Sequence, residues 1–267
     1  MNREARSRWL LVLGVPLGVL CGMLGLSGTE YRAPVLRAFF RYPAERVAPF
    51  NLTISVMTLG GAIVGRESST SAALLWPYLP ELAALVLGTL LGVYVAGRFL
   101  SRVSVLAVEQ WTLSALVVIG TAMIGVVMLP MPVPALPAHL AVRLPAGVAL
   151  GLLIGAVSSV RSISGGELLI PALVLAFGVD IKIAGSASAC MSFPIVLAGL
   201  VRHTRQREYV PEREYRELVI PMGIGSALGA VTGGSLVAYM STFALTVTLG
   251  ALLIASAVRS FQFRPQS

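Results

Sequence analysis

The chain has 267 residues, of which 56% are hydrophobic and only 12% are charged. A typical soluble domain carries roughly 25% charged residues, so a soluble fold of this size could not cover its surface. Composition therefore predicts an integral membrane protein. The net charge of +8 does not indicate nucleic acid binding, because the basic residues are mostly arginines at the edges of apolar runs. Two cysteines and two histidines exclude a disulfide framework and a metal site rich in either residue.

Apolar stretches without any Asp, Glu, Lys or Arg follow one another along the chain, and about 20 such residues cross a bilayer as a helix. The first follows an arginine-rich start that resembles a signal peptide, but no small-residue cleavage site follows, so we expect a retained helix. The last is long enough for two helices, with a break at residues 239–242. The stretches are 9–29, 47–65, 82–96, 110–140, 144–160, 183–201 and 218–258. We therefore predict an all-α polytopic membrane protein with eight long transmembrane helices.

Two shorter apolar pieces, 33–40 and 168–179, are too short to cross the bilayer comfortably. We expect them to form two short, broken or re-entrant helices. A proline-rich segment at residues 129–143 separates two halves, because such a density of proline stops a helix. The sequence thus predicts a first transmembrane repeat at 1–128, a linker at 129–143 and a second repeat at 144–267.

The two halves share a pattern when the sequence is shifted by 137 positions. Ser27-Gly28 pairs with Ser164-Gly165, Glu30 with Glu167, and Pro34 with Pro171. Matches of Gly and Leu are frequent by chance in such a composition, but a shared S-G-x-E-x-x-x-P in register is not. We interpret the chain as an internal repeat.

Loop charges favour inverted topology for the two repeats. The segment after Gly65 is nearly uncharged from residue 68 to 80, whereas the equivalent segment after Val201 is strongly basic. Because cytoplasmic loops carry an excess of arginine and lysine, these two segments should lie on opposite sides of the membrane. Opposite sides require an odd number of crossings per repeat, and five per repeat places both termini in the cytoplasm.

Inverted repeats with broken helices are typical of secondary transporters, whose sites lie where the breaks meet. In each half a Ser-Gly pair precedes a short apolar helix, and a helix start attracts anions. The alternative that each glutamate only complements the start of its own helix stays open. A second polar break is expected at 48–53 and at 185–190. We predict substrate-binding residues Ser27, Gly28, Glu30, Asn51, Ser164, Gly165, Gly166, Glu167, Ser186 and Ser188, and hinges at Pro34 and Pro171.

Other residues near these segments have a simpler interpretation. Arg32, Arg37 and Arg161 have the planar fork that binds oxyanions, but we expect them to extend toward the membrane interface along their apolar stems. Gly88, Gly92, Gly225 and Gly229 are spaced by four, which favours close helix packing over ligand binding.

The second half contains the segments SGGELLIPAL at 164–173 and DIKIAGS at 180–186. Through these two segments it resembles the TauE/SafE sulfite exporter family. In the first half the corresponding run is GLSGTE at 25–30, and Pro49 and Asn51 stand where the family would have serine or threonine. The resemblance implies a bacterial inner-membrane exporter of small sulfur oxyanions, such as sulfite or organosulfonates.

We therefore expect a secondary transporter of a small anion, with an anion channel or a transporter of another small solute as the alternative. An enzyme is not expected, since the sequence has no H-E-x-x-H metal site and no nucleophile paired with a base. No cofactor and no metal are expected. The expected partners are the lipid bilayer and the small anion, without nucleic acid, and a homodimer stays open.

Overall fold

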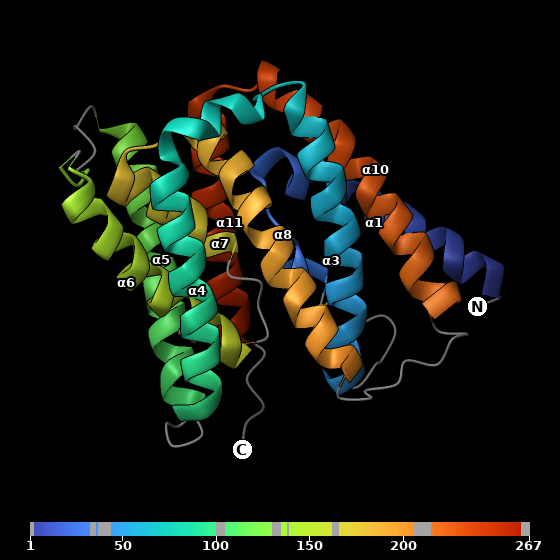
Figure 1. Cartoon of the computed structure of the whole chain (residues 1–267). Coiled ribbons are helices and arrows are strands. Elements are labelled where there is room, and N and C mark those ends of the chain that lie inside the picture. Colours follow the sequence, from blue (N-terminus) through green and yellow to red (C-terminus); the bar gives the residue numbers. More distant parts are fainter. Residues whose placement is uncertain are drawn as a thin grey trace. The chain divides into compact units, whose positions relative to one another are not determined.

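The structure is a computed structural model that describes residues 3–32, 36, 44–99, 105–129, 135–137, 139–161, 166–205 and 215–262. Every regular element within these ranges is a helix (Figure 1). An uncharged apolar run favours this outcome, because a helix satisfies its backbone N–H and C=O groups internally where lipid offers no partners. The all-α prediction is confirmed for this part of the chain.

Eight helices of 17 to 25 residues account for most of the described chain. They are α1 (Arg3–Leu24), α3 (Ala44–Glu67), α4 (Leu79–Phe99), α5 (Val105–Met128), α6 (Leu140–Arg161), α8 (Ile181–Arg205), α10 (Ile220–Leu236) and α11 (Thr242–Gln262). Shorter pieces are the 3-10 helices η1 (Ala72–Tyr78) and η5 (Val237–Tyr239), the helix α7 (Gly166–Pro171), and the π-helices η3 (Ala172–Ala176) and η4 (Tyr215–Val219). The expected break between two helices at residues 239–242 is confirmed.

Five helical segments of the described chain are long and apolar enough to cross a membrane. They are Ser7–Leu24, Ala72–Ala96, Leu140–Ser158, Ile181–Val201 and Tyr215–Tyr239. Thr112–Met128, Gly166–Ala176 and Thr242–Val258 are shorter apolar helices. The chain is therefore a multi-pass membrane protein, while the count of eight crossings stays a prediction.

The chain forms two compact units, and each contains residues from both predicted repeats. Unit 1 comprises Met1–Leu74 and Gly185–Tyr239, and unit 2 comprises Leu75–Ala184 and Met240–Ser267. The repeat boundaries at 1–128 and 144–267 are a property of the sequence and remain a prediction. Helix α6 begins at Leu140, so the last residues of the predicted linker at 129–143 are helical.

Helix starts support an internal repeat. Three pairs of helices, α1 with α6, α3 with α8, and α5 with α11, begin at positions separated by the 137 residues of the sequence repeat. The starting residues are Arg3 and Leu140, Ala44 and Ile181, and Val105 and Thr242. Equivalent positions of the two halves therefore begin equivalent helices. Inverted topology of the halves remains a prediction.

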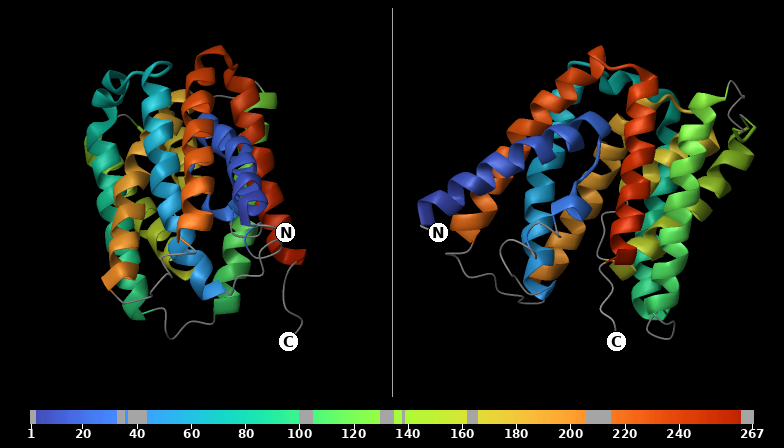
Figure 2. Two further views of the ribbon diagram at one scale, coloured as in Figure 1. Left: turned by 90° about the vertical axis from the view of Figure 1, so that its right-hand side faces the viewer. Right: turned by 180° about the vertical axis from the view of Figure 1, so that it is seen from behind.

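The same helix contact occurs once in each unit. In unit 1, α1 packs along α10, and in unit 2, α6 packs along α4 (Figure 2). A Cβ atom on Gly18 of α1 would overlap the carbonyl oxygen of Ser226, and one on Gly155 of α6 would overlap that of Thr89. Gly18 and Gly155 are repeat equivalents, as are Ser226 and Thr89, so the two contacts are equivalent.

The glycines spaced by four face helix backbones, which confirms their expected packing role. Gly88 and Gly92 of α4 face Val148 and Leu152 of α6, and Gly225 and Gly229 of α10 face Leu11 and Val15 of α1. Small residues let helix backbones approach closely within a membrane, where apolar burial alone supplies little drive between helices.

The second polar breaks expected at 48–53 and 185–190 are wrong, because α3 and α8 continue through them. Within α3, Thr53 donates to the Pro49 carbonyl at 3.1 Å and Ser55 to the Asn51 carbonyl at 2.7 Å. These hydroxyls bond four residues back along the helix, which satisfies them without unwinding it. The segment after Gly65 is also shorter than expected, since α3 ends at Glu67 and η1 begins at Ala72.

An apolar cluster in unit 1 joins α1, residue 36, α3 and the η4–α10 segment. Its members are all at most 2% exposed: Leu10, Leu36, Val47, Phe50, Ile54, Leu218, Val219 and Met222. Ile54 lies one turn from both Asn51 and Thr58, so this packing fixes the α3 face that carries these polar side chains.

Candidate functional site

The first S-G-x-E segment leaves α1 through two glycines with positive φ. Gly25 has φ +76° and Gly28 has φ +72°, a conformation that costs L side chains about 1–2 kcal/mol. The N–H groups of Gly25 and Leu26 both donate to the Cys21 carbonyl, at 2.8 and 2.9 Å, which closes the end of α1. The backbone becomes helical again at Thr29, and Arg32 N–H donates to the Gly28 carbonyl at 3.2 Å.

Gly25 also brings this segment against α8. A Cβ atom on Gly25 would overlap the carbonyl oxygen of Gly185, so the two backbones are in direct contact. Ser186 and Ser188 follow on α8 and are 6% and 0% exposed. Within unit 1, the structure thus places the predicted site residues on α8 beside the end of α1.

Arg32 lies at the centre of a polar cluster in unit 1 and is completely buried. Its Nε donates to Asn51 Oδ1 at 3.2 Å, and its Nη1 donates to Thr58 Oγ1 at 2.8 Å. Its Nη2 donates to the Ser27 carbonyl and to Ser55 Oγ, the latter at 2.6 Å. The expectation that Arg32 extends toward the membrane interface is wrong, because these acceptors hold the guanidinium inside the protein.

Every acceptor of Arg32 is electrically neutral: two hydroxyls, one amide oxygen and one backbone carbonyl. Among the described side chains, no Asp or Glu pairs with this guanidinium. Asn51 is itself fixed, since its Nδ2 donates to the Thr29 carbonyl at 2.6 Å. The cluster therefore holds a positive charge in a rigid, neutral frame.

A second buried arginine, Arg66, was not anticipated as part of a site. It is 2% exposed and donates to Ser186 Oγ at 2.9 Å and to the carbonyls of Gly22 and Met23 at 3.1 and 2.7 Å. Its contacts join α3, the end of α1 and α8 within unit 1. The sequence carried one signal: Gly61 and Gly65, spaced by four, directly precede Arg66, and both face the α10 backbone.

Four of the predicted site residues, Ser27, Gly28, Asn51 and Ser186, lie in these two arginine clusters. Ser188 is buried on α8, whereas Glu30 is only partly buried. Pro34, Ser164, Gly165 and Arg37 lie outside the described residues, as does the side chain of Arg161.

The second motif belongs to unit 2, where Gly166, Glu167 and Pro171 form α7 and are all buried. Pro171 joins α7 to the π-helix η3 without ending the helical path. The convergence of the two motifs in one site remains a prediction.

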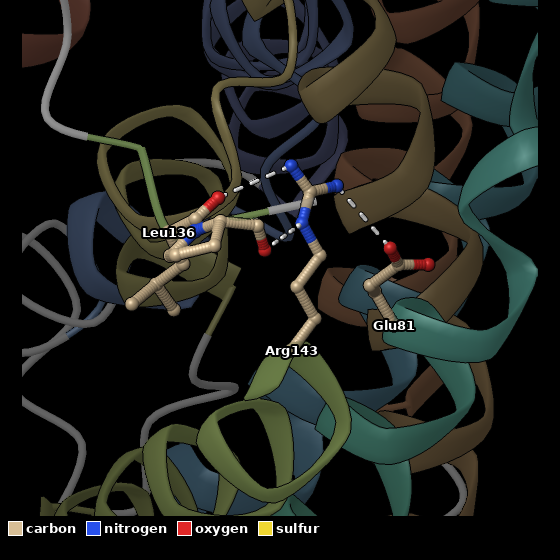
Figure 3. A network of polar contacts seen from close by, with 4 residues as sticks. Glu81, Leu136 and Arg143 are labelled. Atoms are coloured by element: carbon tan, nitrogen blue, oxygen red, sulfur yellow. Dashed lines mark hydrogen bonds and ion pairs between the residues drawn. The ribbon is translucent and has the colours of Figure 1, made fainter. Parts of the chain in front are cut away.

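A polar network in unit 2 holds the end of η3. Arg143 at the start of α6 pairs with Glu81 of α4 at 3.3 Å and donates to the carbonyls of Pro137 and Leu136 at 3.2 and 3.4 Å (Figure 3). Leu136 N–H in turn donates to the Ala176 carbonyl at 2.8 Å. Arg143 thus connects α4 and α6 to the helical path that begins at Gly166.

No group of three or more His, Cys, Asp or Glu side chains that would suit a metal ion occurs within the described ranges. The groups that the Arg32 and Arg66 clusters offer to a ligand are therefore buried arginines, hydroxyls and an amide. Such groups recognise oxygen atoms of anions by charge and directed N–H donors.

Helical architecture, apolar spans and helix pairs joined through glycines together define a multi-pass helical membrane protein. Residues 147–267 match the family model described as sulfite exporter TauE/SafE, which confirms the resemblance over this part of the chain. The matched family is one of membrane transporters. No curated protein and no solved structure matches the chain.

Proposed function

We propose that this protein is a secondary transporter that exports a small anion, with a sulfur oxyanion such as sulfite or an organosulfonate as its substrate. The match of residues 147–267 to the sulfite exporter family is the observation that carries the proposal. The apolar spans supply the membrane setting that such a transporter needs. The compartment we propose is the bacterial inner membrane, with both termini in the cytoplasm.

In this proposal the substrate binds between the segment that carries Ser27, Gly28 and Glu30 and the segment that carries Ser164 to Glu167. Asn51, Ser186 and Ser188 line the path. Alternating access would arise from rocking of one part of the helical assembly against the other, with Pro34 and Pro171 as hinges.

An ion gradient or the membrane potential supplies the energy in this proposal. A potential that is negative inside favours outward movement of an anion by about 2.3 kcal/mol per charge at 100 mV. The sequence contains no G-x-x-x-x-G-K-[ST] loop, so nothing in it indicates that the chain hydrolyses a nucleotide.

Transport into inverted membrane vesicles or proteoliposomes tests the proposal. Sulfite, sulfate, thiosulfate and methanesulfonate are compared with protein-free liposomes, with an inside-positive potential in the vesicle to draw the anion in. We expect saturable uptake of at least one sulfur oxyanion. Uptake that rises linearly with concentration would indicate a channel instead. If none of the four anions exceeds the protein-free background, the sulfur-oxyanion function is wrong.

A further inference from the structure

Arg32 carries a positive charge that no Asp or Glu among the described residues neutralises. Removing an arginine from water costs several kcal/mol even after relaxation, and proteins ordinarily offset this cost with a carboxylate. Arg32 is 0% exposed, yet its four hydrogen bonds all end on neutral oxygens. Neutral acceptors satisfy the direction of the N–H groups but leave the net charge in place.

The cluster also keeps two spare donors. A guanidinium has five N–H groups, and the described contacts use one on Nε, one on Nη1 and two on Nη2. A second N–H on Nη1 remains. The Asn51 amide has two N–H groups, of which the Thr29 carbonyl accepts one. Arg32 and Asn51 are in direct contact, so the spare donors belong to one cluster.

The missing side chain of Gly28 lies on the same side of the guanidinium. A Cβ atom there would come within 3.4 Å of both Arg32 Nη1 and Cζ and would overlap Cys21 Sγ. Glycine at this position leaves the space beside the guanidinium to the Cys21 thiol.

We propose that Arg32 binds the anion directly, with Nη1 and the Asn51 amide donating to two oxygens of a sulfite or sulfonate group. This inference rests on the proposed function and identifies Arg32 as the positive charge that selects the anionic substrate. The hydroxyls of Ser55 and Thr58 donate to backbone carbonyls and accept from Arg32, so they orient the guanidinium and do not contact the anion. Arginine is required at this position because a lysine ammonium could not reach four separate acceptors and also present a fifth N–H.

Anion binding to the purified full-length protein in detergent tests the inference, with thermal unfolding as the readout. The probes are sulfite, methanesulfonate, chloride and uncharged dimethyl sulfone. A ligand that binds the folded state raises Tm with its concentration. For the wild type we expect sulfite and methanesulfonate to raise Tm, chloride to do so more weakly and dimethyl sulfone to have no effect. Chloride as effective as sulfite would contradict the directed recognition of oxygens.

Arg32→Gln removes the charge, and Arg32→Lys keeps the charge without the planar fork. We expect at least a tenfold rise in the sulfite Kd for Arg32→Lys and loss of binding for Arg32→Gln. The matched control is Arg216→Gln, which removes an arginine from the exposed start of η4 and should bind sulfite as the wild type does. An unchanged Kd in Arg32→Gln would overturn the inference.

Thr58→Asp keeps the inference testable even if the Arg32 variants fail to fold. It places a carboxylate at the Nη1 acceptor position, so the protein carries its own counter-charge and the charge imbalance disappears. Thr58→Asn has the same shape without the charge. We expect a sulfite Kd at least tenfold higher in Thr58→Asp than in Thr58→Asn, and equal values would contradict the inference.

Transport by the wild type separates the two proposals. If the wild type transports sulfite while Arg32→Gln and Thr58→Asp bind it normally, the inference is wrong and the proposed function stands. If binding depends on Arg32 but no sulfur oxyanion is transported, the function is wrong and the anion site stands.

Discussion

At the scale of single residues, the turn between α1 and Arg32 depends on two glycines, because a side chain at either position would not fit. Gly25 touches the α8 backbone and Gly28 leaves room for Cys21 and the Arg32 guanidinium. Both glycines have positive φ, so backbone conformation and close contact impose the same residue type. The shape of the Arg32 cluster is therefore sensitive to a single methyl group.

Gly28→Ala tests this sensitivity. The positive φ alone costs about 1–2 kcal/mol for an L side chain, and the overlap with Cys21 adds to it. We expect a fall in Tm of several degrees by thermal unfolding, and the added Cys21→Ala change should restore part of it. Gly60→Ala is the control, since Gly60 lies in α3 with nothing within 4 Å of an added Cβ, and alanine should stabilise that helix by about 0.5–1 kcal/mol. Equal Tm values for Gly28→Ala and the wild type would show that the turn tolerates a side chain.

The polar types at the first motif could be predicted from sequence, because Ser, Asn and Gly interrupting apolar runs indicate function inside a membrane. Asn51 accepts from Arg32 through its side-chain amide, whereas Ser27 accepts through its backbone carbonyl, and their role in substrate binding stays a prediction. The role of the arginines could not be predicted, since an arginine at the edge of an apolar run has the same local pattern whether it extends to the interface or turns inward. Only acceptors distant in sequence, such as Thr58 for Arg32 and Ser186 for Arg66, determine the outcome.

At the scale of helices, close packing through glycine explains how α1 joins α10 and how α6 joins α4. In both pairs the glycines of each helix face the backbone of the other. Van der Waals contact between backbones provides the association that apolar burial cannot provide within lipid.

Gly18→Ala and Gly155→Ala should have similar effects, because the two glycines form equivalent contacts in the two units. Each added Cβ would overlap a carbonyl oxygen of the partner helix, and overpacking of this kind costs about 1–3 kcal/mol. Thermal unfolding should show a similar loss of Tm in both variants. The control is Gly125→Ala in α5, where nothing lies within 4 Å of the added Cβ. A loss confined to one variant would contradict the equivalence of the contacts.

Most helices could be predicted from uncharged apolar runs, including the break before α11, because length and hydropathy are local properties of the chain. The expected polar breaks within α3 and α8 failed for a local reason as well. Serine and threonine hydroxyls can bond to the carbonyl four residues back, so a polar residue does not require an unwound helix. Hydropathy does not distinguish these two outcomes.

At the scale of the whole molecule, each unit combines both halves of the sequence. Unit 1 contains α1 of the first half with α10 of the second, and unit 2 contains α4 of the first half with α6 of the second. The repeat could be predicted from residue matches at one spacing. The distribution of the two halves over the two units could not be predicted, because the pairing of helices more than 200 residues apart leaves no local pattern in the sequence. Residues 1–128 alone would leave α1 without its glycine-matched partner.

The predicted inversion of the two repeats also predicts which loops face the cytoplasm. The basic segment at 202–216 should face inward and the nearly uncharged segment at 68–80 outward. In a Cys21→Ala/Cys190→Ala background, Ala73→Cys, at an exposed position of η1, should react with an impermeant maleimide in intact cells. Gln206→Cys should react only in inside-out vesicles. Detergent-permeabilised samples control for reactivity. Because opposite sides need an odd number of crossings between equivalent loops, labelling of both positions from one side would rule out inversion.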